Sequence, residues 1–146
     1  MYILLFIGPG LQTYPLNQDY IVTADFVPTE GKTIAITNVL GDVQQEPTPG
    51  ELRFRLNDQD LRLVPTSGGR GRLFIVFSDL TKGKGTYPGG RFLDAGAPVN
   101  GRVLLDFNKA YSPPCAFTPY ATCPLPPREN QLPVAIEAGE KYVRQH

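Results

Sequence analysis

The residues best suited to chemistry in this chain are two cysteines, Cys115 and Cys123, in a proline-rich segment at positions 111–130. A zinc site needs about four ligands, usually in close pairs, and the one histidine, His146, is the last residue, so no metal site is predicted. A nucleophilic cysteine needs a neighbouring base, and none is placed to serve. A disulfide would require an oxidising compartment. We therefore favour two packed free thiols, with a structural or redox-active disulfide as the alternative.

A second chemical candidate is the glycine-rich connection from Asp79 to Arg91. It holds three cationic side chains, Lys82, Lys84 and Arg91, and four glycines, so side-chain and backbone donors could converge on a phosphate or carboxylate. The spacing does not match the nucleotide-binding P-loop. The alternative is a solvated turn between strands, in which Tyr87 is a structural residue.

Polar side chains also precede the proline-rich segment. Asp106 and Asn108 alternate with apolar residues at the end of an expected strand, where they either cap backbone amides or contact a ligand below the segment. The full candidate ligand-binding set is Lys82, Lys84, Tyr87, Arg91, Asp106, Asn108, Tyr111, Tyr120, Glu129 and Asn130.

The elements that must position these residues are strands, because apolar and polar residues alternate through most of the chain. A hairpin at 51–64 carries regularly spaced arginines and is predicted to have one solvated face, whereas 72–77 is apolar nearly throughout and is predicted to be central. We predict an all-β fold: about eight strands in a single antiparallel β-barrel or β-sandwich, with a long ordered Pro/Cys-rich loop. The expected strands span 20–27, 32–40, 51–56, 60–64, 72–77, 91–95, 102–108 and 132–137, and 128–131 is expected to form one helical turn.

Composition limits the domain count and the partners. The expectation is one β domain over residues 1–146, with 1–9 as an edge strand or a truncated or replaced N-terminus and 142–146 as a frayed tail. The apolar start, Met1 to Ile7, is too short to span a bilayer and lacks a signal-peptide pattern. Fourteen basic and fourteen acidic side chains cancel, so neither nucleic acid nor membrane is an expected partner. The predicted location is cytoplasmic, no cofactor is identified, and a homo-oligomer stays open.

Three long runs carry a resemblance to a known family: DLTKGKGTYPGGRFL at 79–93, VLLDFNKAYSPPCAFTPYATCPLPPREN at 103–130, and LPVAIEAGEK at 132–141. They resemble the bacterial and archaeal family called "domain of unknown function 1684". The resemblance implies a soluble prokaryotic protein of mostly β structure whose members usually carry an additional N-terminal segment. It implies no established activity, cofactor or catalytic residue.

Three functional hypotheses follow. The first is a binding module for a small anionic or polar ligand, in a pocket under the Pro/Cys-rich loop walled by Arg91, Asp106 and Asn108. The second is a hydrolase or lyase that uses Asp106, Glu129 or Tyr87 with Arg91 as an electrostatic stabiliser. The third is an assembly or interaction protein whose apolar loop, with Phe117, Tyr120 and Leu125, forms an interface.

Overall fold

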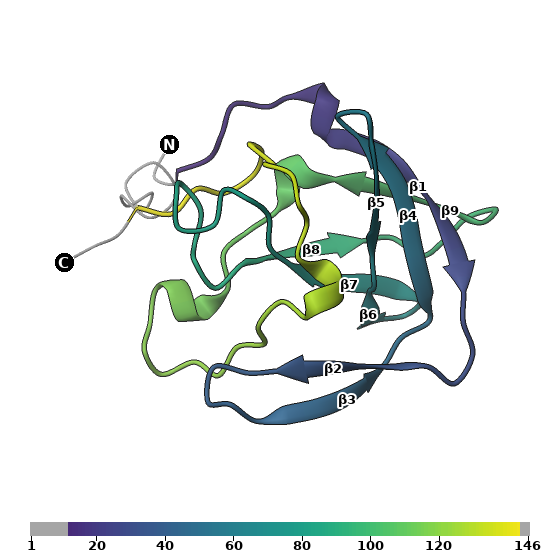
Figure 1. The fold of residues 1–146 in the computed structure, drawn as a ribbon, viewed down its shortest axis with the longest axis horizontal. Coiled ribbons are helices and arrows are strands. Elements are labelled where there is room, and N and C mark those ends of the chain that lie inside the picture. The colour runs from purple at the N-terminus through teal and green to yellow at the C-terminus, as the bar shows by residue number, and fades with distance from the viewer. Residues whose placement is uncertain (1–11, 144–146) are drawn as a thin grey trace.

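The computed structural model describes residues 12–143, which form three antiparallel sheets and several short 3-10 helices (Figure 1). The sheets have the strand orders β5-β4-β1-β9, β6-β7-β8 and β2-β3. The strands are β1 (Ile21–Pro28), β2 (Thr33–Thr37), β3 (Val43–Pro47), β4 (Gly50–Leu56), β5 (Gln59–Leu63), β6 (Thr66–Gly69), β7 (Arg72–Phe77), β8 (Arg91–Ala95) and β9 (Arg102–Asp106). The 3-10 helices are η2 (Gln18–Tyr20), η3 (Phe107–Lys109), η4 (Pro114–Ala116) and η5 (Arg128–Asn130).

Strands β1 to β4 form one long bent hairpin that contributes to two layers. Between the β1–β4 and β2–β3 pairs, the Thr29 N–H donates to Pro49 O at 3.1 Å and the Thr48 N–H donates to Lys32 O at 3.1 Å. At the bend, a Cβ on Gly50 would lie 2.5 Å from Val27 O, so only glycine allows this close approach of the two arms. The hairpin β2–β3 therefore leaves the four-stranded sheet and lies below β6 and β7 in Figure 1.

Strand β7 is covered on both faces, as its continuous apolar sequence predicts. Leu73, Ile75 and Phe77 point into the core shared with the four-stranded sheet, while Phe74 and Val76 face the side of the hairpin β2–β3. The solvated face predicted for 51–64 is also confirmed, because Arg53 and Arg55 are exposed between buried residues of β4.

Two parts of the predicted fold are wrong. The described sheets stay separate, so the barrel alternative does not apply. Segment 132–137 forms no strand, because Pro133 has no N–H to donate and the Ile136 N–H donates instead to the carboxylate of Asp79, at 2.6 Å. Its side chains nevertheless reach the core as expected, with Val134 and Ile136 buried.

Element bounds differ at several further places. Strand β9 ends at Asp106, and residues 107–109 form η3 instead of continuing the strand. The sequence pattern missed β3 and β6, whose polar and glycine residues show no apolar alternation, whereas the helical turn expected at 128–131 is present as η5. Tyr142 belongs to the tail expected to be frayed, yet its N–H donates to Gly85 O at 2.8 Å. The expectations for 1–9 lie outside the described residues.

Candidate functional site

Arg91 begins β8 and is buried, with 1% of its surface exposed. Its guanidinium donates to three main-chain carbonyls of the C-terminal segment, those of Ala138 at 2.5 Å, Ile136 at 3.1 Å and Glu140 at 3.2 Å. Arg91 therefore fastens residues 136–140 to the end of the core. We define this as the arginine clamp.

The carboxylate of Asp79 completes the arginine clamp. Its Oδ1 lies 3.5 Å from Arg91 Nη2, and its oxygens also accept from the Thr81 hydroxyl at 2.9 and 3.0 Å. The Thr81 and Thr86 hydroxyls are 2.9 Å apart, so the network continues into the glycine-rich connection. Burial lowers the pKa of the Arg91 guanidinium, and the neighbouring Asp79 opposes that shift. Because Asp79 and main-chain carbonyls already accept from both terminal nitrogens, Arg91 is a structural cation in this arrangement.

Asp106 and Asn108 form a cap, as the simpler of the two hypotheses states. Asp106 Oδ1 accepts from the Asn108 N–H at 3.0 Å and from the Asn108 side chain at 2.9 Å. The Asn108 Oδ1 in turn accepts a hydrogen bond from the Asn17 N–H, and the Asn108 Nδ2 donates to Asn17 O, both at 3.0 Å. The pair thus joins the start of η3 to the segment before η2.

Asn130 is an internal cross-link at the end of the proline-rich segment. With 1% of its surface exposed, it accepts from the Val64 N–H at 2.7 Å and donates to Val64 O at 2.9 Å and Val76 O at 3.0 Å. These bonds tie η5 to the residue after β5 and to β7. The sequence could not show that Asn130 has a structural role, because its hydrogen-bond partners are all main-chain groups, which leave no pattern of residue types.

Tyr111 extends the free edge of β8. It exchanges both main-chain hydrogen bonds with Phe92, and its hydroxyl donates to Asp94 Oδ2 at 3.0 Å. Partial burial, followed by the hydrogen bond to Asp94 and its negative charge, raises the pKa of the Tyr111 hydroxyl to about 12.

The remaining sequence-predicted residues are dispersed over the surface. Tyr87 contacts the ring of Tyr142, with centroids 5.1 Å apart, and its hydroxyl donates to Cys115 O at 3.4 Å. Tyr120 is 92% exposed at the tip of the loop. Lys82, Lys84 and Glu129 are exposed as well. The structure therefore does not gather the ten candidates into one pocket.

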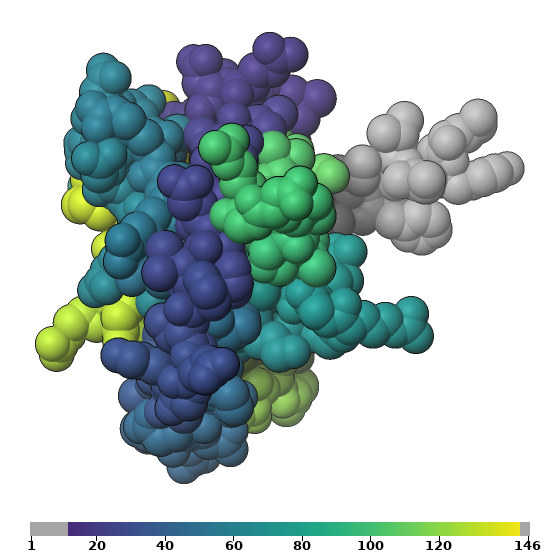
Figure 2. Space-filling view, turned by 90° about the vertical axis from the view of Figure 1, so that its right-hand side faces the viewer, coloured from purple at the N-terminus to yellow at the C-terminus, as the bar shows by residue number. Residues whose placement is uncertain are grey.

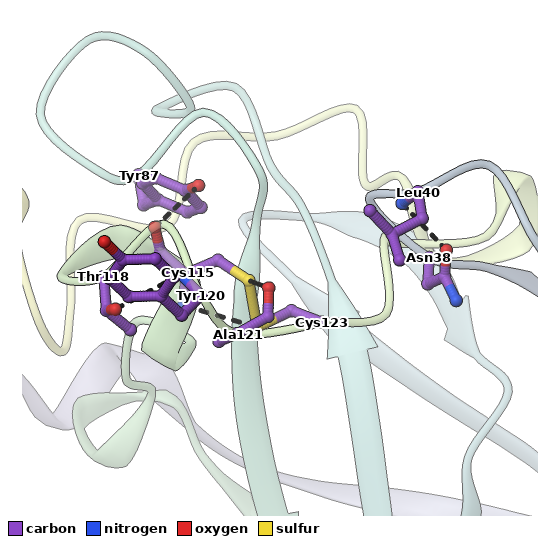
Figure 3. The surroundings of a disulfide bond; sticks show 8 residues. All are labelled: Asn38, Leu40, Tyr87, Cys115, Thr118, Tyr120, Ala121 and Cys123. Carbon is purple, nitrogen blue, oxygen red and sulfur yellow. Dashed lines mark hydrogen bonds between the residues drawn. A yellow bond between two sulfur atoms is a disulfide. The ribbon is translucent and has the colours of Figure 1, made fainter.

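Cys115 and Cys123 are joined in a disulfide, so the preference for free thiols is wrong (Figure 3). The bond closes a short loop between positions eight apart in sequence. Sequence could not decide this pairing, because the compartment argument for reduced thiols says nothing about how close the two Cβ atoms lie in the fold.

A pocket does lie beside this loop, but other residues line it. The cavity, of about 370 Å³, opens between the hairpin β2–β3, the strands β6 and β7, and residues 122–124. We name it the hairpin pocket. Its lining consists of Ile36, Asn38, Asp42, Gln44, Glu46, Thr66, Ser67, Phe74, Val76, Thr122 and Pro124. Sequence reasoning missed Gln44, Glu46, Thr66 and Ser67 because β3 and β6 were not predicted as strands.

A larger hollow, of about 800 Å³, lies on the outer face of β4 and β5. Its arginines are paired: Glu51 contacts Arg53 at 3.1 Å and Arg62 at 3.4 Å, and Asp60 contacts Arg55 at 2.9 Å. This solvated sheet face continues onto β1 and β9, which Figure 2 shows side by side above the hairpin β2–β3. Its ion pairs make it a weaker candidate than the hairpin pocket.

Two features are absent from the described part of the chain. Residues 12–143 contain no group of three or more histidine, cysteine or acidic residues arranged to hold a metal ion. In the same range no helix has the length and apolar character needed to cross a membrane.

Comparisons with known proteins agree with the fold and supply no activity. A solution NMR structure of an uncharacterised protein from Haloarcula marismortui is similar, with 31% identity and a TM-score of 0.75, over 94% of this chain and 78% of that one. No curated protein matches the chain. A family model described as "Protein of unknown function (DUF1684)" matches residues 9–141. The chain therefore belongs to the DUF1684 family, as its three long sequence runs predicted.

Proposed function

We propose that this protein is a small binding module and that its ligand is a neutral or cationic polar molecule held in the hairpin pocket. The observation that carries the proposal is a cavity between two β layers in which apolar side chains lie beside several polar ones. Ligand sites in proteins typically combine a mainly apolar surface with a few converging polar groups, in cavities of about 300–1,000 Å³. At about 370 Å³ the hairpin pocket falls at the small end of that range.

The apolar side chains include Ile36, Phe74 and Val76, which come from the two facing layers. Asn38 is held in place at the rim because its Oδ1 accepts the N–H groups of Leu40 at 2.8 Å and Asp42 at 3.1 Å. This turn leaves the Asn38 amide nitrogen as a donor. Amide and hydroxyl groups of this kind suit hydroxyl and amine groups of a ligand.

The charges at the rim select among polar ligands. Asp42 and Glu46 are among the lining residues, whereas no lysine or arginine is. An anion would meet two carboxylates and no compensating cation, which opposes binding. The anionic ligand considered from sequence therefore receives no support at this pocket, and a polyol or an amine is favoured.

Amide NMR spectra of the protein, titrated with three small-molecule probes, would test the proposal. Glycerol represents polyols, putrescine represents amines and succinate represents anions. We expect shifts at Thr66, Ser67 and Thr122 with glycerol or putrescine, and none at these residues with succinate. If none of the three probes shifts these amides, or if succinate alone does, the proposal is wrong.

A matched pair of variants on β3 would locate the binding. Gln44 lines the hairpin pocket, while Gln45 lies on the opposite face of the same strand and accepts from the Thr33 hydroxyl at 2.9 Å. Gln44→Trp should fill the mouth and abolish the shifts, and Gln45→Trp should leave them in place. Equal effects of the two substitutions would place the binding elsewhere.

A second candidate function is a partner interface at the loop tip, where Phe117 is 50% and Tyr120 92% exposed. Light scattering of the wild type and of Tyr120→Ser would reveal a self-association that depends on this tip. Catalysis is not proposed, because Arg91, the stabiliser in that hypothesis, belongs to the arginine clamp. The cytoplasmic location stays a prediction.

A further inference from the structure

The two cysteines of the disulfide differ in their exposure to solvent. Cys115 is partly exposed in the middle of η4, whereas Cys123 is buried, with 4% of its surface exposed. Thiol–disulfide exchange requires an incoming thiolate to reach one sulfur. Cys115 is therefore the more accessible point of attack.

The segment between the two cysteines, 116–122, depends on the disulfide for its position. Its hydrogen bonds within the described part of the chain are local: Ala116, Phe117 and Thr118 donate their N–H groups to Pro113 O or Pro114 O, and Tyr120 donates to the Thr118 hydroxyl. One further contact is aromatic, between Phe117 and Tyr142, with ring centroids 6.4 Å apart.

The buried end of the disulfide is joined to the hairpin pocket. Cys123 stands between Thr122 and Pro124, which both line the pocket. Its carbonyl accepts from the Val39 N–H at 3.0 Å, and the Leu125 N–H donates to Thr37 O at 2.7 Å. Figure 3 shows the disulfide between the loop tip, with Thr118 and Tyr120, and the stretch that leads towards Asn38 and Leu40. The bond thus anchors the loop wall where it meets β2.

We propose that Cys115 is a site of thiol–disulfide exchange with a dithiol reductant, and that reduction releases the loop wall of the hairpin pocket. One thiolate of the reductant attacks Cys115 Sγ, the bond between the two cysteines breaks, and Cys123 leaves as a thiolate that takes up a proton. The second thiolate of the reductant then attacks the mixed disulfide and frees Cys115, which is protonated in turn. Two electrons pass to the protein, and the reductant leaves as a cyclic disulfide.

After reduction, segment 116–122 keeps its local turns but loses its covalent tie to Cys123. The wall at 122–124 is then held by the two hydrogen bonds to Thr37 and Val39, and we expect it to open more often. Any effect on a ligand rests on the function proposed above. The release of the wall does not, so the two proposals can fail separately.

Hydrogen–deuterium exchange of the protein with and without dithiothreitol would test this inference. Iodoacetamide alkylates free thiols, so the mass of the treated protein first establishes whether dithiothreitol has reduced the disulfide of the native protein to two thiols. We then expect the amides of Val39 and Leu125 to exchange about tenfold faster or more after reduction, while Ile75 in β7 stays protected.

Three outcomes would overturn the proposal. The disulfide could resist excess dithiothreitol in the native protein, or Val39 and Leu125 could keep their protection after reduction. Ile75 could also lose protection together with them, which would mean that the disulfide stabilises the whole fold and not the loop wall alone. The variant Cys115→Ser/Cys123→Ser should reproduce the reduced pattern without reductant. If that variant fails to fold, reduction of the wild type still decides the result.

Discussion

The arginine clamp gives the sharpest test of how this fold is held together. Arg91→Met keeps much of the aliphatic length of the side chain but removes its charge and all its donors. Three carbonyls, those of Ile136, Ala138 and Glu140, lose a partner, and the buried carboxylate of Asp79 loses its cation. The perturbation acts at one residue and affects the whole C-terminal segment.

The magnitude follows from burial, since both side chains of the pair are only 1% exposed. Removing one partner of a buried ion pair costs about 3–5 kcal/mol, because the other charge is left uncompensated. A domain of this size has a total stability of about 5–15 kcal/mol. We therefore expect Arg91→Met to lower the melting temperature by about 10–20 °C. Chemical denaturation followed by circular dichroism measures the free energy of unfolding directly.

Two controls test whether the loss comes from the buried ion pair. Arg72→Met removes an exposed arginine of β7 and should change the free energy of unfolding by less than about 0.5 kcal/mol. The double variant Arg91→Met/Asp79→Asn should lose less stability than the sum of its single changes, because neither charge then remains unpaired. A loss below about 1 kcal/mol for Arg91→Met would refute the buried-pair argument.

Three further predictions concern single contacts. Asn130→Ala leaves the Val64 and Val76 main-chain groups without their partner and should lower the free energy of unfolding by about 3 kcal/mol, measured by denaturation; no loss would exclude the cross-link. Gly50→Ala places a Cβ 2.5 Å from a carbonyl oxygen and should cost about 1–3 kcal/mol, whereas Gly96→Ala meets nothing within 4 Å and should be nearly neutral. Asp94→Asn should lower the pKa of Tyr111 from about 12 towards its ordinary value of 10.0, read from tyrosinate absorbance. Because that pKa is raised in the folded state, its contribution to stability is present below pH 10 and is lost as the pH rises towards 12 in the wild type.

The strands that sequence predicted well are those with one apolar face. In β4 and β7 the alternation or continuity of apolar residues specifies burial directly, and both strands lie where the pattern placed them. Strand β3 was missed because its sequence, Val-Gln-Gln-Glu-Pro, is mostly exposed and is stabilised by pairing with β2. Pairing of this kind depends on the partner strand and leaves no periodic signal.

The candidate site was harder to predict because the same residue types serve structure and function. Arg91 and Asn130 were selected as reactive or ligand-binding side chains. In the structure both donate hydrogen bonds to main-chain carbonyls that are far away in sequence. A buried arginine whose partners are carbonyls cannot be told from a ligand-binding one without the fold. The hairpin pocket lies beside the Pro/Cys-rich loop, but Arg91, Asp106 and Asn108, which were expected to wall a pocket there, are not among its lining residues, and most of its polar ones come from β3 and β6.

The bent hairpin also implies that this molecule has two levels of stability. Its β2–β3 arm contributes one buried apolar side chain, Ile34, whereas the β1–β4 arm belongs to the main core. Segments with few buried contacts open at a lower free-energy cost than the global unfolding reaction. The arm can thus detach as a sub-global unit at the bend near Gly50 while the core remains folded. A thermal melt reports the core, so the opening of the arm that forms one side of the hairpin pocket is invisible to it.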